Sequence, residues 1–377
     1  MKQPTKGLFL VFHGFAPHNG ISKKIHYQRD ALLRCGADVG LCYTTIAPDG
    51  TQKRMLDDTV IADFGGGKGA KVRKRIDYRA VVSAARKQGV RFVYARHDHN
   101  ASPVTIGLYR ALHRLGIRIA LEVPTYPYDP EFAQSPWPRK LKLRIDRLFR
   151  RRMARYIDRI VTFTDEPEIF GRPTIRISNG IDFGHIPVKP HRNDTSHELN
   201  LIGVADLHFW HGFDRVIEGM AAYEATPHDR KVRFHIVGAG VEAERNRLRE
   251  LATRYGLTDR VVLYGNRAGT GLDELFDRCD MGIASLGRHR NGITKIKTLK
   301  NREYAARGIP FVYSETDDDF DAMPYVLKAP ADESPLDIAA LVRFYDSADT
   351  DPARIRASVE GWLSWEVQMR KVLDELL

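Results

Sequence analysis

One stretch organises the chain: residues 286–312 read LGRHRNGITKIKTLKNREYAARGIPFV. This pattern predicts a polar loop, a short helix that Thr298 caps and Gly308 ends, and then a buried strand. The apolar residues 281–284 predict the strand that leads into the loop. Helix amides at the carboxyl end of a strand suit a phosphate group, and the Glu303 carboxylate suits sugar hydroxyls. An ordinary connection between a strand and a helix accounts for the local pattern equally well.

Outward from this stretch, short apolar runs alternate with amphipathic segments along the whole chain. The alternation opens with a strand, a helix and a strand across residues 7–43, and it restarts at Leu199 after a proline-bearing linker near residue 190. Such alternation forms a doubly wound sheet, and 377 residues are long for one core. We therefore predict an α/β fold of two Rossmann-like doubly wound domains facing each other across a cleft. The predicted domains span residues 1–187 and 188–362, and a final helix follows at 363–377.

Composition excludes several classes of protein. A hydrophobic content of 43% and a charged content of 28% are typical of a soluble globular chain. No apolar run approaches the ~20 residues that a membrane-spanning helix needs, and the N-terminal run is too short for a signal peptide. The three cysteines have the spacing of neither a zinc site nor a disulfide framework. We therefore expect a protein of the reducing cytoplasm.

The net charge of +11 is concentrated in one predicted helix. Residues 139–159 hold ten Lys or Arg side chains and only two Asp. Basic residues beside an apolar face suit the surface of an anionic membrane, which we predict as a partner. Nucleic acid is not predicted, because no nucleic-acid motif is present and basic residues elsewhere are balanced by acids. A solvated basic face is the plain alternative. The apolar residues on one side of this helix are Leu141, Ile145, Leu148 and Phe149.

Polar residues gather where the predicted strands end. The carboxyl ends of parallel strands meet at one edge of a sheet, and open α/β sheets bind ligands there. Two facing domains would bring both sets of loops into one cleft, where each domain holds one substrate and closure excludes water. The polar segments are 13–20, 96–100 and 122–129 in the first half, and 206–211, 238–240, 265–267 and 286–292 in the second half.

Two histidine pairs lie in these segments. His97 and His99 are two residues apart, as in some metal sites, but no third ligand has an obvious spacing. His97 could instead hydrogen-bond a sugar or a leaving phosphate, and a solvated loop histidine is the alternative. His208 and His211 precede a predicted helix and could contact a diphosphate at its N-terminus. Surface histidines around a packed Trp210 are the alternative for this pair.

Two further segments have simple interpretations. Residues 65–69 read GGGKG, which lacks the spacing of a phosphate-binding P-loop, so we predict a flexible basic loop. Residues 317–321 carry four Asp side chains and could mimic a metal-binding motif. An exposed acidic turn is the simpler prediction for them.

Three motifs together resemble the retaining GT-B glycosyltransferases of the family 4 type: Asn179-Gly-Ile-Asp182, Trp210-His-Gly-Phe-Asp-Arg215 and Arg302-Glu-Tyr-Ala-Ala-Arg-Gly-Ile-Pro310. Residues 122–128 are similar to bacterial enzymes of capsular or exopolysaccharide assembly. The resemblance covers essentially the whole chain and implies a GT-B fold. It implies a nucleotide-sugar donor in the C-terminal half, an acceptor in the N-terminal half, and retention of anomeric configuration without a bound metal or other cofactor. It also implies that the last helix crosses back onto the first domain.

The resemblance assigns donor-binding roles in the second half. Glu303 matches the second glutamate of the family's E-x7-E motif, which holds the donor ribose, whereas the first falls on Lys295. His211 stands where the family has a lysine, so another cation of the opening stretch would supply the missing charge. The candidates for that charge are Lys297, Lys300 and Arg302. The predicted donor-binding residues are Glu303, His208, His211, Gly238, Asn266, Gly292, Ile293, Lys297, Lys300 and Arg302.

The resemblance also assigns roles in the first half. Residues 14–20 match the family's first glycine-rich loop, near the acceptor and the diphosphate. His97 lies where the family has a histidine close to the transferred sugar, and it is the predicted catalytic residue. The predicted acceptor and diphosphate residues are Gly14, Asn19, Gly20, Arg96, Glu122, Thr125 and Tyr126. No metal ligand is predicted.

The function predicted from these features is transfer of a sugar from a nucleotide sugar to a lipid-linked saccharide in bacterial surface polysaccharide biosynthesis. No protein nucleophile is evident, so we expect attack on the face that the phosphate leaves, with the phosphate taking the proton. A sugar-nucleotide epimerase or phosphorylase of the same fold stays open. A degenerate sugar-nucleotide-binding protein also stays open, because Lys295 and His211 depart from the family pattern. The expected location is the cytoplasm, on the inner face of the cell membrane.

Overall fold

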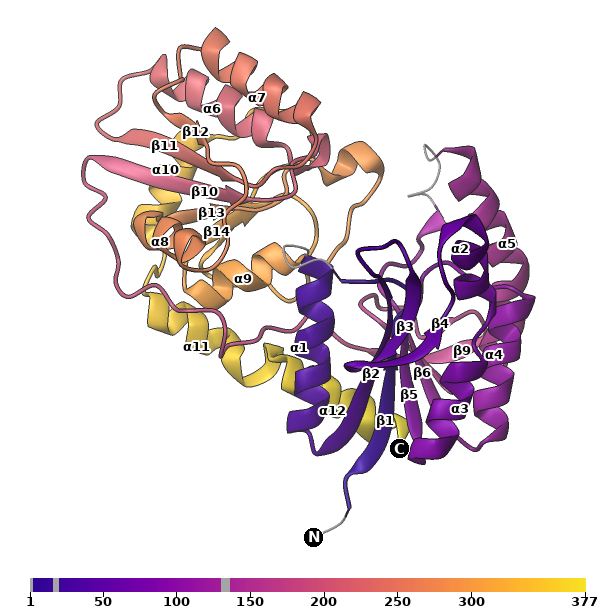
Figure 1. Ribbon diagram of the computed structural model, residues 1–377. Coiled ribbons are helices and arrows are strands. Elements are labelled where there is room, and N and C mark those ends of the chain that lie inside the picture. The colour runs from indigo at the N-terminus through magenta and orange to yellow at the C-terminus, as the bar shows by residue number, and fades with distance from the viewer. Residues whose placement is uncertain (1–2, 16–19, 130–135) are drawn as a thin grey trace. The chain divides into compact units, whose positions relative to one another are not determined.

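The computed structural model describes residues 3–15, 20–129 and 136–377, and the chain divides into two compact units (Figure 1). The first unit runs to Ser178 and also contains Trp365–Leu377, whereas the second unit is Asn179–Ser364. Residues 179–187 and 363–364 therefore belong to the second unit and not to the part of the chain in which the sequence placed them. The last helix belongs to the first unit, although the whole second unit precedes it in the sequence.

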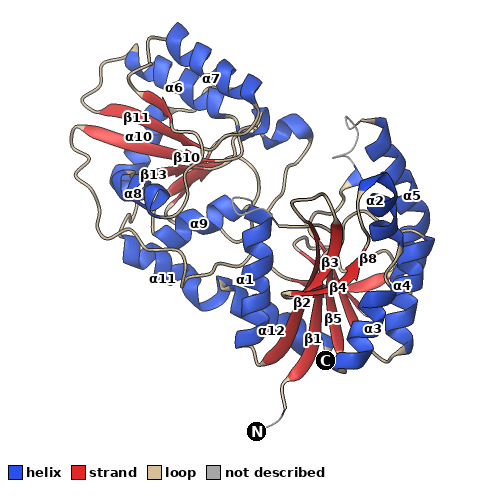
Figure 2. Cartoon of the chain, in the orientation of Figure 1, coloured by secondary structure: helices blue, strands red, loops and turns tan. Residues whose placement is uncertain are grey.

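The first unit is built on a sheet whose strands are β1 (Thr5–Leu10), β2 (Ala37–Ile46), β3 (Gln52–Leu56), β4 (Thr59–Asp63), β5 (Phe92–Arg96), β6 (Arg118–Val123), β7 (Arg159–Thr162), β8 (Glu168–Ile169) and β9 (Arg172–Arg176). Their order is β4-β3-β2-β1-β5-β6-β7-β9-β8. Figure 2 shows β2, β1 and β5 next to one another in this sheet. The central strands are parallel, whereas β3 pairs antiparallel with both β2 and β4. This hairpin of β3 and β4 forms one edge of the sheet.

Helices cover both faces of this sheet. The helices are α1 (Gly20–Arg34), α2 (Gly67–Ile76), α3 (Arg79–Gln88), α4 (Pro103–Arg114), α5 (Trp137–Ala154) and α12 (Trp365–Leu376). One core joins alternate strand residues to α3, α4 and α5, and the other joins the intervening residues to α1 and α12. The prediction of a flexible loop at residues 65–69 was wrong for its second half, because α2 begins at Gly67.

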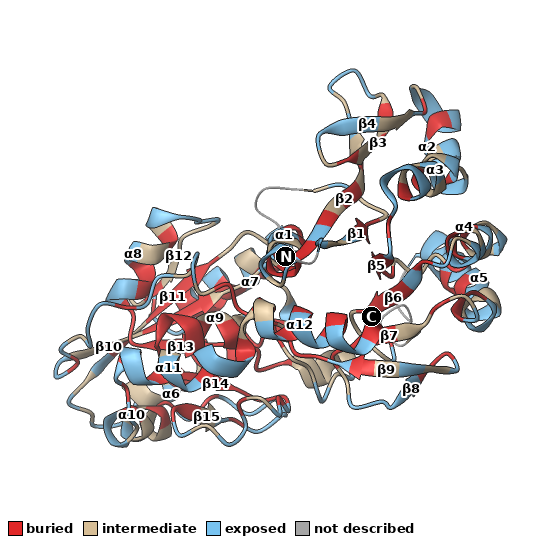
Figure 3. Ribbon diagram, turned by 90° about the horizontal axis from the view of Figure 1, so that it is seen from below, coloured by how far each residue is buried: buried red, intermediate tan, exposed pale blue. Residues whose placement is uncertain are grey.

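The second unit is built on a fully parallel sheet whose strands are β10 (Glu198–Val204), β11 (Lys231–Val237), β12 (Val261–Leu263), β13 (Met281–Ile283), β14 (Phe311–Tyr313) and β15 (Val326–Lys328). Their order is β12-β11-β10-β13-β14-β15. The chain thus leaves β10 toward one edge and returns at β13 to build the other edge. In Figure 3 the buried residues gather along the strands, where both faces are covered.

The helices of the second unit are α6 (Phe213–Glu224), α7 (Glu242–Arg254), α8 (Thr270–Arg278), α9 (Leu299–Arg307), α10 (Ile338–Ser347) and α11 (Pro352–Leu363), with the short 3-10 helices η2 (Phe209–His211) and η3 (Arg288–Asn291). Helices α6, α7 and α10 share one core with the sheet, and α8, α9 and α11 share the other. The predicted caps of α9 are confirmed. The Thr298 side chain accepts a hydrogen bond from the Asn301 amide, and Gly308 ends the helix at a φ of 76°. Helix α11 was not predicted.

Candidate functional site

The site is positioned by the point where the strand order of the second sheet reverses, between β10 and β13. The loops that follow two such strands diverge and leave room for a ligand at the carboxyl edge of the sheet. Here η2 follows β10 and η3 follows β13. The Leu286 amide donates to the His211 carbonyl at 2.9 Å, and the Arg290 guanidinium donates to the Phe209 carbonyl at 2.7 Å. The two loops are therefore held together at the reversal.

His211 and Lys300 meet in this place, although 89 residues separate them in the sequence. The Lys300 Nζ lies 2.9 Å from the His211 Nδ1, and the His211 Nε2 lies 3.0 Å from the Asp206 carbonyl oxygen. A carbonyl only accepts, so Nε2 carries the proton and Nδ1 accepts from the ammonium group. Burial, with Lys300 beside it, holds the pKa of His211 well below its usual range. His211 is therefore a neutral group that orients Lys300.

The surroundings of Lys300 lower its pKa. Burial lowers the pKa of Lys300, and the nearby Arg288 guanidinium lowers it further. Among the described residues, no carboxylate lies within ion-pair distance of its Nζ. Because Lys300 belongs to the first turn of α9, a bound anion would meet the ammonium group and the helix amides together.

The other two candidate cations are already paired. Arg302 is 1% exposed and forms ion pairs with Asp317 and Asp319, and Lys297 lies 2.9 Å from Asp319. The prediction of an exposed acidic turn is wrong for Asp317, which is 0% exposed and also accepts from the Asn301 side chain at 3.0 Å. Breaking such a buried pair costs several kcal/mol, so Arg302 holds the loop after β14 in place.

Glu303 and Lys295, the two positions of the E-x7-E pattern, have different surroundings. Glu303 is half-buried on α9, and its Oε1 accepts from the Arg307 Nε at 3.1 Å. Arg307 also pairs with Asp273 at 2.8 Å, so the Glu303 carboxylate is held from one side. Lys295 is exposed and pairs with Asp318 at 2.5 Å. The Lys295 ammonium group thus has a carboxylate partner in the loop after β14.

The remaining predicted donor residues lie around the same edge with weaker contacts. His208 stacks on Trp210 with ring centroids 4.1 Å apart, as the surface alternative for this pair described. Gly238 has a φ of 134°, and a Cβ there would meet the Ala205 carbonyl oxygen at 1.7 Å, so it allows the loops after β10 and β11 to pack. Asn266 and Gly292 are exposed, and Ile293 is half-buried.

Reasoning from the sequence did not single out Glu315, which lies two residues beyond the end of β14. It is 2% exposed, and neither oxygen of its carboxylate has a hydrogen-bond partner in the described structure. Burial raises the pKa of Glu315, whereas Lys300 and Arg288 act in the opposite direction. No local pattern marks such a residue, because a Glu in a polar loop normally points to water.

In the first unit, His97 belongs to a buried group at the carboxyl end of β5. Its Nε2 lies 3.2 Å from the Tyr128 hydroxyl and 3.4 Å from the Asp146 carboxylate, and Tyr128 donates to Asp146 at 2.5 Å. Burial alone would raise the pKa of Asp146, but the hydrogen bonds from His97 and Tyr128 hold it below its usual range. The Nδ1 atom of His97 is buried and has no partner in the described structure. In a neutral imidazole the proton would lie on Nε2, which faces these acceptors, and Nδ1 would carry the lone pair.

Arg96 and Glu122 were predicted to lie by the acceptor, but the structure places them in a buried polar group. Glu122 is 0% exposed and contacts Arg96, Lys24, Gln28 and Tyr94. Arg96 and Glu122 are buried because the side chains at the ends of β5 and β6 still point into the core between the sheet and α1. Both side chains therefore have partners within the sheet and α1, and their role beside the acceptor stays a prediction.

The other predicted residues of the first unit that the structure describes lie at or near its surface, Gly20 as the first residue of α1 and the rest in loops. Gly14 and Gly20 are exposed, and Thr125 and Tyr126 are half-buried. The Tyr126 ring packs against Phe170 with centroids 5.8 Å apart. Asn19 lies outside the described residues. Within the described part of the chain, no group of three or more His, Cys, Asp or Glu side chains is arranged to hold a metal ion.

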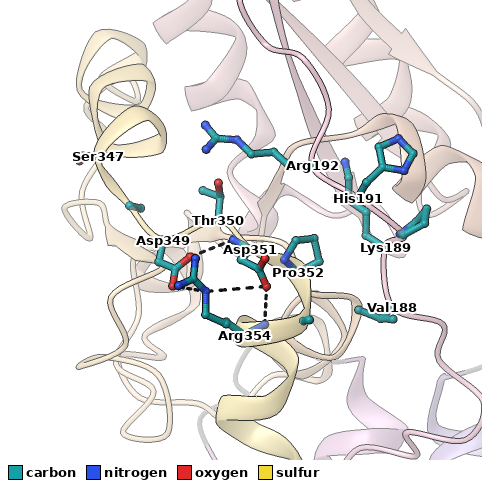
Figure 4. A pocket seen from close by; sticks show the side chains of 13 residues that line it. Val188, Lys189, His191, Arg192, Ser347, Asp349, Thr350, Asp351, Pro352 and Arg354 are labelled. Carbon is teal, nitrogen blue, oxygen red and sulfur yellow. Dashed lines mark hydrogen bonds and ion pairs between the residues drawn. The ribbon is translucent and has the colours of Figure 1, made fainter.

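A cavity of about 870 Å³ in the second unit lies elsewhere, between the segment 188–192 and the segment 347–354 (Figure 4). Its charged groups largely neutralise each other, because Arg354 lies between Asp349 and Asp351. None of the predicted donor residues lines this cavity.

Comparison with known proteins agrees with this geometry. Residues 198–334 match the model of the family Glycosyl transferases group 1, which supports glycosyl transfer as the class of activity. This segment contains both sides of the strand-order reversal and every predicted donor-binding residue. No curated protein sequence matches the chain.

Solved structures resemble the chain over nearly its whole length. A glycosyltransferase from Rickettsia africae ESF-5 has a TM-score of 0.66 and 12% identity, covering 100% of this chain and 98% of that one. Sucrose-phosphate synthase from Thermosynechococcus elongatus has a TM-score of 0.67 and 14% identity, covering 99% of this chain and 98% of that one. Anabaena HepE in complex with UDP-glucose has a TM-score of 0.62 and 16% identity, covering 98% of this chain and 100% of that one. The chain thus has the two-domain, Rossmann-like GT-B fold that was predicted.

Proposed function

We propose that this protein is a glycosyltransferase that moves a sugar from a nucleotide-sugar donor to a saccharide acceptor. The observation that carries the proposal is one coincidence within the second unit. The segment that matches the glycosyltransferase family, residues 198–334, also contains the strand-order reversal where Lys300 and His211 meet. In this proposal the donor binds the second unit and the acceptor binds the first.

The chemistry of the proposed reaction matches these groups. Glycosyl transfer requires stabilisation of a departing diphosphate, and fixed cations and helix amides supply it. Lys300, Arg288 and the first turn of α9 form this set, and a bound dianion would favour the charged form of Lys300. Glu303 would hold the ribose hydroxyls through the oxygen that does not face Arg307.

We further propose that the transfer retains the anomeric configuration and, as in the family that the chain resembles, uses no metal. The acceptor hydroxyl would attack on the face that the diphosphate leaves, and the diphosphate would take its proton. His97 would accept a hydrogen bond from the transferred sugar at Nδ1, while Asp146 fixes the ring through Nε2. The acceptor, in this proposal, is a lipid-linked saccharide of a bacterial surface polysaccharide.

The surface of α5 supports the membrane part of the proposal. Within the described part of the chain, no helix has the length and apolar character needed to cross a membrane. Helix α5 instead exposes apolar side chains, and Trp137 and Leu148 are 69% and 63% exposed. We propose that this stripe, with the basic residues beside it, binds the inner face of the cell membrane from the cytoplasm. The exposed apolar stripe consists of Trp137, Leu141, Ile145 and Leu148.

A panel of nucleotide sugars, including UDP-glucose, tests the proposed donor site by thermal shift. A ligand at 100 times its Kd adds about 2.7 kcal/mol of stability, which raises the unfolding temperature measurably. Glu303→Gln should weaken the stabilising donor at least tenfold, because a carboxylate that accepts from hydroxyls contributes about 1.5–3 kcal/mol. The matched variant Glu274→Gln, on the exposed surface of α8, should bind as the unaltered protein does.

Turnover of the binding donor with a panel of saccharide acceptors then tests transfer, and NMR of the product tests retention. An inverted product would contradict the proposed mechanism. Donor conversion without any acceptor would favour an epimerase, and binding without turnover would favour a degenerate sugar-nucleotide-binding protein. Absence of binding by every nucleotide sugar would overturn the donor assignment.

A further inference from the structure

The ends of β13 and β14 carry two buried polar side chains with unused hydrogen-bonding capacity. The Ser285 hydroxyl is fully buried and has no partner in the described structure, and the same holds for both oxygens of Glu315. The Ser314 amide donates to the Ser285 carbonyl at 3.0 Å, so the two strand ends are joined next to these side chains. The backbone therefore holds a hydroxyl and a carboxyl group at the carboxyl edge of the second sheet, next to the strand-order reversal.

The contrast with Asp317 indicates what Glu315 does. Asp317 is equally buried, and Arg302 and Asn301 satisfy its carboxylate. Among the described residues Glu315 has no such partners, although leaving a buried carboxylate unsatisfied is costly to the fold. Lys300 is the cation that lowers the pKa of Glu315 most. The Lys300 Nζ, however, is hydrogen-bonded to His211 and forms no ion pair with Glu315 in the described structure. A buried carboxylate without partners does not stabilise the fold, but its oxygens can accept hydrogen bonds from a ligand.

The chemistry of the ligand follows from the groups around it. A phosphate placed against Glu315 would meet a like charge, so the diphosphate belongs on the side of Lys300 and Arg288. Glu315 needs hydrogen-bond donors, and Ser285 can both donate and accept. Sugar hydroxyls next to a diphosphate provide this combination. Lys295, where the resemblance places the first glutamate of the E-x7-E pattern, has an ammonium group that is paired with Asp318.

We propose that Glu315, together with Ser285, binds hydroxyl groups of the transferred sugar and so selects which nucleotide sugar is used. This inference rests on the proposed glycosyltransferase function and adds a specificity-determining residue to it. In this proposal the carboxylate that binds the sugar is residue 315, beyond the end of β14, and not residue 295. The fold keeps it buried near Lys300 and Arg288, the cations proposed to bind the diphosphate.

The test compares a nucleotide sugar with its own nucleoside diphosphate, because only the former carries the sugar. UDP-glucose and UDP are the first pair, and the pair that the panel identifies replaces them if UDP-glucose does not bind. Glu315→Gln should weaken binding of the nucleotide sugar about 10- to 100-fold, as expected for loss of hydrogen bonds to a charged acceptor. Binding of the nucleoside diphosphate should stay unchanged or become tighter, because a negative charge has been removed.

Two further variants complete the design. Ser285→Ala, which changes a buried side chain by one oxygen atom, should weaken the nucleotide sugar and spare the diphosphate in the same way. Glu274→Gln on α8 should change neither affinity. Retained diphosphate binding shows that each variant is folded around the site. Unchanged binding of both ligands by Glu315→Gln, or equal loss of both, would overturn the assignment of Glu315. An unaltered protein that binds no nucleotide sugar would overturn the proposed function itself.

Discussion

At the scale of single residues, burial separates carboxylates that hold the fold from one that a ligand could use. Glu122 and Asp317 are both 0% exposed, and each meets a guanidinium group of the same unit. Glu315 is almost as buried but has neither of its oxygens satisfied in the described structure. The difference lies in partners and not in exposure, and only the first two residues have a clear structural role.

Glu122 gives a prediction about stability and pH. Burial alone would raise its pKa, but Lys24 and Arg96 outweigh that effect and lower the pKa of Glu122 from 4.5 to about 2. A carboxylate with a lowered pKa stabilises the fold fully above its unfolded pKa, and this contribution is lost as the pH falls from about 4.5 through about 2. The shift corresponds to about 3 kcal/mol. Glu122→Gln should therefore destabilise the first unit by several kcal/mol at pH 7 and remove this acid-dependent part.

Urea unfolding of the first unit at pH 7 and at pH 3 measures both effects. The unaltered protein should lose stability between the two values, and the Glu122→Gln variant should lose less. Glu274→Gln, an exposed carboxylate on α8, is the control and should follow the unaltered protein. A Glu122→Gln variant that is as stable as the unaltered protein at pH 7 would contradict the structural role of Glu122.

At the scale of elements, α5 has two different faces. Leu143, Asp146 and Met153 are buried against the first unit, whereas the exposed apolar stripe lies on the far side of the helix. The sequence placed Phe149 on that stripe, but Phe149 is half-buried against the core, and Trp137 lies on the stripe instead. A hydrophobic pattern on a helix thus contained both a packing face and an exposed face, which periodicity alone does not separate.

The exposed stripe predicts binding to anionic vesicles. The unaltered protein should co-sediment with phosphatidylglycerol vesicles, bind phosphatidylcholine vesicles weakly, and lose affinity as salt rises. Leu141→Ser with Leu148→Ser should lower the affinity at least tenfold, because each buried Leu side chain contributes about 1.5–3 kcal/mol. Val72→Ser, an exposed apolar residue on α2, is the matched control. Equal binding to neutral vesicles, or no loss in the double variant, would refute the membrane proposal.

At the scale of the whole molecule, the chain crosses between units twice and ends in the unit where it began. Helix α12 lies beside α1 and buries Trp365, Met369 and Val372 in the core of the first unit. The Gln368 side chain accepts from the Ser178 amide at 2.8 Å, next to the point where the chain leaves this unit. The first unit is therefore complete only when the C-terminal segment is in place.

Trp365→Ala tests this arrangement by calorimetry. The variant should destabilise the first unit by about 3–5 kcal/mol and lower its unfolding temperature, because a large buried side chain leaves a cavity. The transition of the second unit should stay where it is. Val367→Ala changes an exposed residue of the same helix and should have little effect. Equal shifts of both transitions would show that α12 does not stabilise the first unit alone.

The local sequence by itself determined the alternation of strands and helices, the caps of α9, and the parallel α/β architecture. These features depend on which residues within a few positions are apolar, hydrogen-bonding or flexible, so periodicity and capping rules are enough to read them. The hairpin of β3 and β4 and the helix α11 were not predicted from the sequence.

Only the tertiary structure decided which charged residues are partners of one another. Lys297, Lys300 and Arg302 are equivalent cations in the sequence, yet Asp319 and Asp317 take two of them, and His211 orients the third from 89 residues away. In the same way, the fold brings Lys24 and Arg96 into ion pairs with Glu122, whereas Glu315 has no hydrogen-bond partner in the described structure. The physical reason is that burial and ion pairing depend on segments that are distant in the chain, and no local pattern records which of them will meet.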